Sequence, residues 1–329
     1  METRRRAIIE SVTTAAVAYV VAAVTEAGVI RTLRPTEWEL AWVSDVVLSV
    51  ALGVAVYLWR HLRATRLELA ARERAELVLH TQLTIAADIQ RRLLPDLPRP
   101  GNGVEWAARL ETAGKIGGDL YDIVEVGPEQ WLALVVDVSG KGIPAAMALG
   151  SLHSTFRALA RAHDRPAHIL TRLSAQLYDE WHGEPYVTGI VVRLDARQRV
   201  LTYANAGHPA GIVTGPTGVR LLDAMGPPAA LLPRTTYDER DMAVDGGDAC
   251  ILVSDGVTEA LESEPGRPLD QIVAIAGHHA GSAESVCRAV MERALRAVGP
   301  PGVPEWHDDR TVLVLTIHEN GPAAAIHAA

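Results

Sequence analysis

The stretch Trp131–Met147, WLALVVDVSGKGIPAAM, decides how the rest of the chain is interpreted. It begins as an apolar run typical of a buried strand, and Asp137 follows where that strand is expected to end. A glycine turn, Ser139–Gly142, comes next, and Pro144 then opens an alanine-rich helix, because proline suits the first helical turn. A carboxylate at a strand end beside a glycine turn is a common ligand for a hard metal ion. One such aspartate is weak evidence by itself, so its partners must be sought elsewhere in the chain.

Composition excludes some classes of protein. The chain has 329 residues, more than one ordinary domain needs, with 48% hydrophobic residues and a net charge of −9. Because no basic surface is available overall, nucleic acid is not expected as a partner. The two cysteines, Cys250 and Cys287, lack metal-binding or redox spacing, so we expect buried, inert thiols and a reducing cytosol.

Two apolar runs stand near the N-terminus, at about residues 7–25 and 40–59. Each is long enough to cross the roughly 30 Å hydrocarbon core as a helix. Basic residues flank the outer ends of the pair, which by the positive-inside rule places both ends in the cytoplasm. We therefore predict a membrane hairpin over residues 1–60, which holds the chain in the lipid bilayer of the cell membrane. A cleaved signal peptide for the first run, and a buried helical pair in a soluble protein, are the alternatives.

Residues 61–98 are predicted to form a linker helix. The segment is rich in Arg, Glu, Leu and Ala and contains no Gly or Pro before Pro95. A partial leucine heptad, interrupted at Arg72 and Glu76, makes a coiled-coil homodimer one alternative. A solvated helix docked on its own catalytic domain is the other.

The remaining chain, residues 99–320, predicts a cytoplasmic α+β domain, followed by a disordered tail at residues 321–329. The expected strands are Val104–Glu111, Leu120–Val126, Trp131–Val138, Tyr186–Leu194, Val200–Ala204, Ala249–Ser254 and Thr311–Ile317. The expected helices are Ile143–Ala162, Ala167–His182, Leu269–Ala276 and Ala283–Ala297. The helices cluster in two blocks between runs of strands, which indicates α+β layering and not a doubly wound parallel sheet.

Four aspartates share a position at a strand terminus. Asp119 begins one expected strand and Asp137 ends the next. Asp255 follows a third strand, and Asp308 immediately precedes the last one. Strand-end carboxylates that converge on one edge of a sheet would form an oxygen-rich site for a hard cation. No cluster of His or Cys in the sequence suggests zinc instead.

Six motifs occur in a fixed order between Ile89 and Ile317: IQRRLLP, GGDLYD, VVDVSGKGIPAAM, YANAGHP, LVSDGVTEA and DDRTVLVL. Together, with these intervals, they resemble the stage II sporulation protein E type phosphatases. These enzymes are the bacterial branch of the metal-dependent PPM protein serine/threonine phosphatases. The resemblance implies a sandwich of two antiparallel β-sheets with helices packed on each outer face.

The resemblance also implies a site with two Mn²⁺ or Mg²⁺ ions. Asp119 and Asp137 would lie between the two ions as the catalytic aspartates, and the backbone carbonyl of Val138 would be a further ligand. Asp255 and Asp308 would complete the shell of the other ion. Two such ions lower the pKa of a water, so that no protein nucleophile is required.

Some residues near these motifs depart from the family or have secondary roles. Asp309 and Asp122 are candidates for a third metal ion or for contacts to the ligands. Where eukaryotic relatives carry a histidine, two residues after the second aspartate, this chain has Ser139. No arginine matches the one that holds phosphate in those relatives, although Lys141 could contribute charge nearby. The identity of any general acid is therefore open.

The expected function is hydrolysis of phosphoserine or phosphothreonine in a protein. The resemblance implies an STAS-domain anti-anti-sigma factor as the substrate, within a partner-switching pathway. A nucleotide cyclase of the diguanylate type is one alternative, since Gly117–Asp119 reads Gly-Gly-Asp, although it continues as Leu-Tyr-Asp and not as Glu-Phe. A scaffold that binds an STAS-domain protein without chemistry is the other.

Overall fold

The computed structural model describes residues 18–19, 38–93, 97–98, 101, 103–140, 142–162, 165–297 and 308–318. The chain divides into two compact units, Met1–Thr81 and Gln82–Ala329. Helix α2, Trp38–Leu93, runs through the boundary between them. The predicted second span and the predicted linker are therefore parts of one continuous helix.

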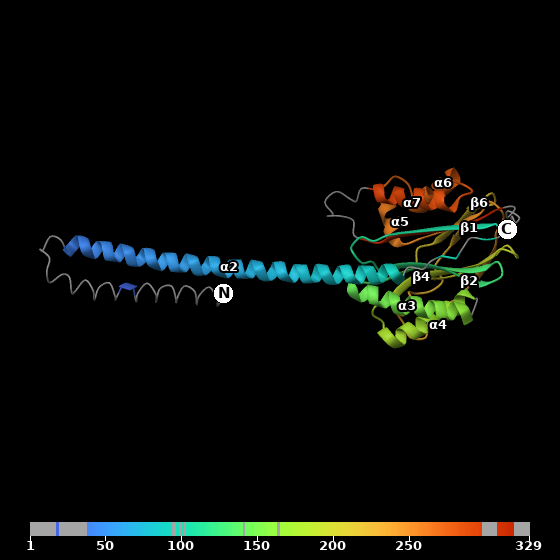
Figure 1. Cartoon of the computed structure of the whole chain (residues 1–329). Helices are drawn as coiled ribbons and strands as arrows, with labels where there is room; N and C mark the ends of the chain where they lie inside the picture. The colour runs from blue at the N-terminus through green and yellow to red at the C-terminus, as the bar shows by residue number, and fades with distance from the viewer. Residues whose placement is uncertain are drawn as a thin grey trace, which may run out of the picture. The chain divides into compact units, whose positions relative to one another are not determined.

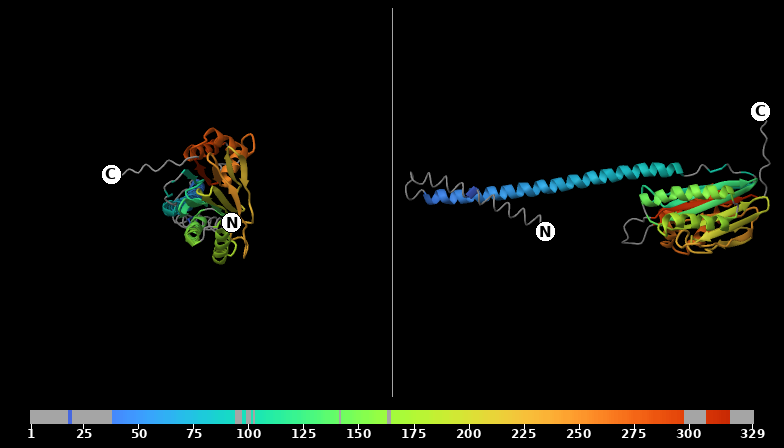
Figure 2. Two further views of the ribbon diagram at one scale, coloured as in Figure 1. Left: turned by 90° about the vertical axis from the view of Figure 1, so that its right-hand side faces the viewer. Right: turned by 90° about the horizontal axis from the view of Figure 1, so that it is seen from below.

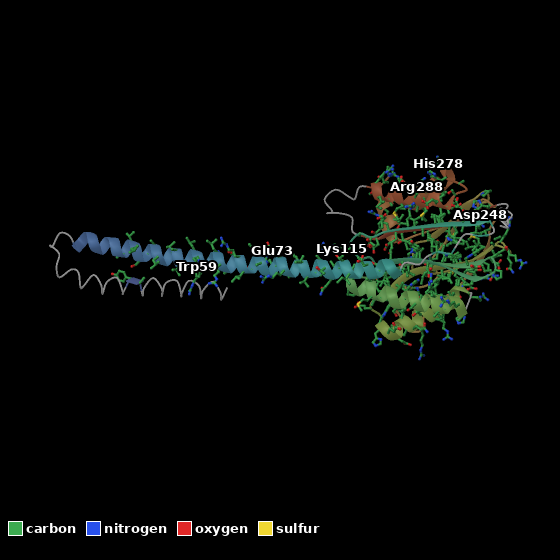
Figure 3. The ribbon with its side chains drawn as sticks, viewed as in Figure 1. Trp59, Glu73, Lys115, Asp248, His278 and Arg288 are labelled. Atoms are coloured by element: carbon green, nitrogen blue, oxygen red, sulfur yellow. The ribbon has the colours of Figure 1, made fainter. Side chains whose placement is uncertain are left out.

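The described part of the first unit is helical. Among the described helices, α2 alone is long and apolar enough to cross a membrane: the stretch Val46–Asp88 contains an 18-residue window with a mean hydropathy of 1.3. Most large apolar side chains of α2 between Val47 and Leu62 are exposed. Trp59, labelled in Figure 3, lies beside Arg63, whose guanidinium is 5.2 Å from the ring centroid. The first predicted span lies outside the described residues apart from residues 18–19, so the hairpin stays a prediction.

The second unit contains two five-stranded antiparallel sheets. Sheet A has, in spatial order, β1 (Val104–Glu111), β10 (Arg310–Ile317), β9 (Ala249–Val253), β6 (Gly211–Gly215) and β7 (Gly218–Leu222). Sheet B has β2 (Asp119–Gly127), β3 (Gln130–Val138), β4 (Val187–Asp195), β5 (Val200–Ala206) and β8 (Arg240–Ala243). Every expected strand is present within two residues of its expected bounds. The three strands that sequence analysis missed, β6, β7 and β8, have five residues or fewer, too few to show a clear alternation.

Helices cover the outer face of each sheet, as Figure 1 shows and as the two views of Figure 2 confirm. Sheet B packs against α3 (Ile143–Ala162) and α4 (Pro166–Trp181). Sheet A packs against α5 (Asp255–Glu262), α6 (Pro268–His278) and α7 (Ala283–Arg296). The α+β fold class and the α-β-β-α sandwich are thereby confirmed. Both cysteines are buried and free, as expected, and burial raises the pKa of each thiol to about 12.

A third apolar cluster fills the layer between the two sheets, and strand alternation decides which side chains enter it. In β3 the odd-numbered residues face sheet A, whereas the even-numbered ones face the helices of sheet B. Trp131 of β3 lies against Trp106 of β1, with ring centroids 5.4 Å apart, where β3 begins. The same alternation, continued to the end of β3, places Asp137 in the layer between the sheets at the opposite end.

Asp122 holds β2 against α3. Its buried carboxylate accepts hydrogen bonds from Arg157 Nε (2.7 Å) and Nη2 (3.0 Å), and it lies 3.0 Å from His153 Nε2. Burial alone would raise the pKa of Asp122, but the bonds from His153 and Arg157 outweigh it and bring the pKa below its usual range. Asp122 is on the helix-facing side of β2, opposite to Asp119. This placement favours a structural role over the predicted metal contact.

Replacement of Arg157 by Leu should destabilise the fold, because it leaves a fully buried carboxylate without its main partner. Loss of one partner of a buried ion pair costs about 3–5 kcal/mol, and we expect about 3 because the Arg157 side chain is 34% exposed. The free energy of unfolding, measured with urea, checks this value. Arg161→Leu, an exposed cation one turn later, is the control and should change it by less than about 0.5 kcal/mol.

The same pair predicts a dependence on pH. The folded-state pKa of Asp122 lies below its unfolded value of about 3.9, so the pair contributes stability above that pH. The contribution is lost as the pH falls through the folded-state pKa. The difference between wild type and Arg157→Leu should therefore shrink in acid. An equal loss of stability in both leucine variants at neutral pH would contradict this account.

Candidate active site

The candidate site lies where the apolar layer between the sheets ends in polar residues. Sheet B contributes Asp119 and Asp137, which are directly opposite each other in the β2–β3 pair. Sheet A contributes Ser254, immediately after β9, and Thr311 in β10. All four continue the alternation of residues that face the other sheet. The pattern that builds the core therefore also brings these polar groups together.

Five of the six predicted acidic residues lie close together at this end: Asp119, Asp137, Asp255, Asp308 and Asp309. The sixth, Asp122, lies on the other face of β2. Burial, together with the negative charges of Asp255, Asp308 and Asp309, raises the pKa of Asp137 to about 7. A hydrogen bond with Asp119 opposes the rise. Carboxylates close enough to perturb one another in this way favour the binding of a cation, which would relieve their repulsion.

Asp119 is the most deeply buried of these carboxylates, at 1% exposure. Burial raises its pKa well above the usual range, the charge of Asp137 adds to the effect, and a hydrogen bond from Thr311 opposes it. His208 supplies no positive charge at this end of the sheets, because burial lowers the pKa of its imidazole to about 3. Its Nδ1 instead lies 3.0 Å from the hydroxyl of Thr188, the residue opposite Asp137 in β4.

Two glycines before β2 bring the backbone close to the carboxylates. A Cβ on Gly118 would lie 2.7 Å from the carbonyl oxygen of Val138 and 3.1 Å from Asp137 Oδ1. A Cβ on Gly117 would collide with the carboxylate of Asp309. Only glycine allows the loop to approach the Val138 carbonyl and the carboxylate of Asp137 this closely.

Asp309 fixes the loop that leads into β2. Its Oδ1 accepts a hydrogen bond from the backbone N–H of Ala113 (2.8 Å), and its Oδ2 accepts one from Gly118 (2.5 Å). Both carboxylate oxygens are therefore engaged by the loop. Of the two roles predicted for Asp309, this geometry favours contacts that support the ligands over the binding of a third ion.

A cavity of about 260 Å³ opens onto the carboxylates. Its lining includes Asp137, Asp308, Asp309 and the loop residues 113–116, with Gly140 and Gly142 from the turn after β3. Lys115, labelled in Figure 3, brings a positive charge to this lining and donates to the hydroxyl of Thr84 (3.2 Å). Pockets for drug-sized ligands have volumes of about 300–1,000 Å³, so this cavity lies just below the lower end of that range. Lys141 lies outside the described residues.

Ser139 occupies the position of the histidine in eukaryotic relatives, but its hydroxyl and its N–H both form hydrogen bonds with the backbone of Tyr186. Its Oγ accepts a hydrogen bond from Tyr186 N, and its own N–H donates to Tyr186 O, both at 2.9 Å. These bonds hold the turn after β3 against the start of β4. They favour a structural role for Ser139 over proton transfer.

The donor set fits divalent cations such as Mn²⁺ and Mg²⁺. Carboxylates and a backbone carbonyl are the hard oxygen ligands that these ions prefer. Within the described residues, no three His, Cys, Asp or Glu side chains already surround one point as a finished metal site. The fit therefore rests on donor chemistry, burial and mutual repulsion.

Sequence analysis missed three residues that act on this site. Thr311 Oγ1 donates to Asp119 Oδ2 (2.6 Å), and Ser254 Oγ accepts a hydrogen bond from Thr311 N (2.9 Å). Gln90, near the end of α2, donates to Gly117 O (2.8 Å) and accepts from Gly117 N (3.1 Å). Extending the strand alternation beyond the last apolar residue would have found Thr311 and Ser254. Gln90 lies in the motif IQRRLLP, but that motif does not indicate its contact with Gly117.

Comparison with known proteins agrees with this geometry. The chain is 26% identical over 242 residues to the phosphoserine phosphatase RsbU of Bacillus subtilis (strain 168), covering 72% of this chain and 70% of RsbU. Its fold is similar to the SiaA-PP2C domain of Pseudomonas aeruginosa (TM-score 0.63, 20% identity, 74% of this chain and 98% of the other). It is also similar to the phosphatase domain and regulatory fragment of SpoIIE from Bacillus subtilis (TM-score 0.58, 18% identity, 68% and 66%).

The sequence profile of one family, stage II sporulation protein E (SpoIIE), matches residues 127–318. This match spans more than half of the chain and includes β3, β4, β5, β9 and β10, together with four of the five clustered aspartates. The chain belongs to the stage II sporulation protein E (SpoIIE) family.

Proposed function

We propose that this chain is a metal-dependent phosphatase that hydrolyses phosphoserine or phosphothreonine in a protein. The observation that carries the proposal is the opposed pair Asp119 and Asp137, surrounded by three further carboxylates in a chain of the SpoIIE family. A negatively charged site of this kind repels a phosphate unless cations are bound in it. Metal dependence is therefore part of the proposal.

In this proposal Asp119 and Asp137 hold two Mn²⁺ or Mg²⁺ ions with the Val138 carbonyl, and Asp255 and Asp308 complete the set. When bound, such ions supply a water of lowered pKa and neutralise charge on the phosphoryl oxygens. The protein positions these ligands from two sheets and keeps Asp119 away from bulk water. No protein nucleophile takes part.

The proposed substrate is a phosphorylated STAS-domain protein, as in a partner-switching pathway. RsbU supports the class of substrate, since it is a phosphoserine phosphatase by name. The small cavity supports a single phosphorylated side chain as the group that enters. The two-sheet fold and the family leave the diguanylate-type cyclase without support.

We also propose that the N-terminal region holds the protein in the lipid bilayer through two spans, with the catalytic domain in the cytoplasm. The apolar stretch of α2 supports the second span. A homodimer through the linker part of α2 belongs to the same proposal, because Leu62, Leu69 and Leu79 are each more than half exposed in the single chain.

Asp137→Asn and Asp255→Asn in the full-length protein should each lose Mn²⁺-dependent phosphate release by about a hundredfold, or roughly 2.7 kcal/mol of barrier. The reason is that each variant removes one negative charge from the proposed ion-binding set. Phosphate release from a phosphorylated STAS-domain protein, with and without Mn²⁺, measures the effect. Asp179→Asn, an exposed carboxylate on α4, is the matched control and should keep full activity.

The same assay separates an enzyme from a scaffold. A scaffold would bind the STAS-domain protein without Mn²⁺ and without the aspartates. Binding that persists in both variants, with no phosphate release from the wild type under any divalent cation, would reject the phosphatase proposal.

Gly118→Ala should weaken the site, because the new Cβ would meet the Val138 carbonyl at 2.7 Å. Relief of this overlap requires a backbone shift that costs about 1–3 kcal/mol and moves a proposed ligand. We expect a higher Mn²⁺ concentration for half-maximal activity. Gly277→Ala, where a Cβ meets nothing within 4 Å, is the control. An unchanged Mn²⁺ requirement in Gly118→Ala would argue against Val138 as a ligand.

We further propose that α2 influences the site through its last turns. Within the second unit, the Gln90 side chain satisfies both backbone groups of Gly117, two residues before Asp119. Leu83, Ala86 and Ala87 pack beside it against Ile116 and Ala146. A movement of this part of α2 would therefore move the loop that leads into β2, next to Asp119.

Gln90→Ala should lower phosphatase activity, because it removes two hydrogen bonds from the buried backbone of Gly117 and frees the loop. Loss of a buried partner costs about 1–3 kcal/mol, which corresponds to roughly a five- to hundredfold effect if it falls on the active conformation. Steady-state kinetics at saturating Mn²⁺ would measure it. Gln82→Ala, an exposed glutamine on α2, is the control, and equal activity of both variants would reject the coupling.

A further inference from the structure

Thr311 connects the two sheets at the candidate site. It belongs to β10 of sheet A, whereas Asp119, which accepts its hydrogen bond, belongs to β2 of sheet B. The side chain is fully buried, and the hydroxyl oxygen lies 2.6 Å from Asp119 Oδ2. The other inward-facing residues of β10, Leu313, Leu315 and Ile317, are apolar. Thr311 is therefore the polar member of an otherwise apolar row of inward-facing residues, and its hydroxyl makes a specific contact with a carboxylate.

The backbone of Thr311 is held firmly enough to orient that contact. Its N–H donates to Ser254 Oγ (2.9 Å), and its carbonyl accepts from Ser254 N (3.1 Å). The Ser254 hydroxyl in turn donates to the carbonyl of Asp309 (3.2 Å). On its other side, Thr311 pairs with Leu110 of β1. The hydroxyl of Thr311 thus projects toward sheet B from a backbone fixed by both neighbouring strands.

We propose that Thr311 is a positioning residue for the metal centre, which orients the carboxylate of Asp119 through the hydrogen bond that its hydroxyl donates to Oδ2. The inference rests on the proposed function, because it gives Asp119 the role of a ligand. A hydrogen bond that fixes a ligand from behind reduces the freedom that the ligand loses when an ion binds. A neutral hydroxyl does this without adding positive charge, whereas a Lys or Arg at the same place would compete with the ion.

Three variants of the full-length protein test the proposal. Thr311→Val keeps the shape and the buried methyl group but removes the donor. Thr311→Ser keeps the donor. Thr316→Val makes the same change in the same strand, at a buried hydroxyl that has no hydrogen-bond partner among the described residues. Circular dichroism and thermal unfolding verify that each variant is folded.

The primary measurement is direct Mn²⁺ binding, by titration calorimetry or by the electron paramagnetic resonance signal of free Mn²⁺. Loss of a residue that supports a metal ligand typically weakens metal binding by about 10–100-fold, which we expect for Thr311→Val. Thr311→Ser and Thr316→Val should stay within about threefold of the wild type. In kinetics, Thr311→Val should need more Mn²⁺ for half-maximal rate, with a smaller change in the rate at saturation.

The outcomes separate the two levels of the proposal. A wild type that binds Mn²⁺, together with an equally tight Thr311→Val, would overturn the positioning role and leave the proposed function intact. Weak binding in Thr311→Ser, equal to that in Thr311→Val, would also overturn it, because the hydroxyl would then not be the cause. A folded wild type that binds no Mn²⁺ would instead overturn the proposed function.

Discussion

Repulsion among buried carboxylates is the constraint that the rest of the second unit accommodates. Asp137 is raised to a pKa of about 7 by burial and by its acidic neighbours, and Asp119 is almost completely shielded from water. Such a cluster opposes folding, since ionised groups in a low-dielectric interior are costly unless they are paired. The three apolar clusters of the sandwich supply the stabilisation that offsets it. A bound cation would act in the same direction.

Hydrogen bonds between the sheets determine where these carboxylates lie. Asp309 precedes a strand of sheet A and binds the backbone of Gly118, which precedes a strand of sheet B. Thr311 crosses the same gap in the same direction to reach Asp119. The apolar layer alone would allow the sheets to slide slightly, because apolar contacts are not directional. These polar contacts are directional, and they set the end of the layer at which carboxylates from both sheets meet.

The sequence predicted the aspartates of this site more readily than the hydrogen bonds that hold them in place. Asp119 and Asp137 were recognisable because each terminates a strand with a clear apolar pattern. Asp122 was assigned to the site because it belongs to the same motif, yet alternation places residues three apart on opposite faces, so it binds Arg157. The bonds from Asp309 to Ala113 and Gly118 join residues 196 and 191 positions apart, and no local pattern reports such an approach. The short strands β6, β7 and β8 were not predicted because so few residues show no clear alternation of apolar and polar side chains.

The contacts at this end also distinguish the part of the site that can change conformation from the part that cannot. Asp119, Asp137 and Thr311 continue strands whose other residues form the core, so they cannot move without disturbing the packing on both sides. The loop between β1 and β2 is different, because a few side-chain hydrogen bonds hold its backbone. Asp309 accepts one bond each from Ala113 and Gly118, and Gln90 exchanges two bonds with Gly117. Local structure of that kind opens at lower free energy than a packed strand. A signal that reaches this domain would therefore act on the loop and leave the strand-borne aspartates in place, since a few bonds in the loop can exchange while the core stays intact.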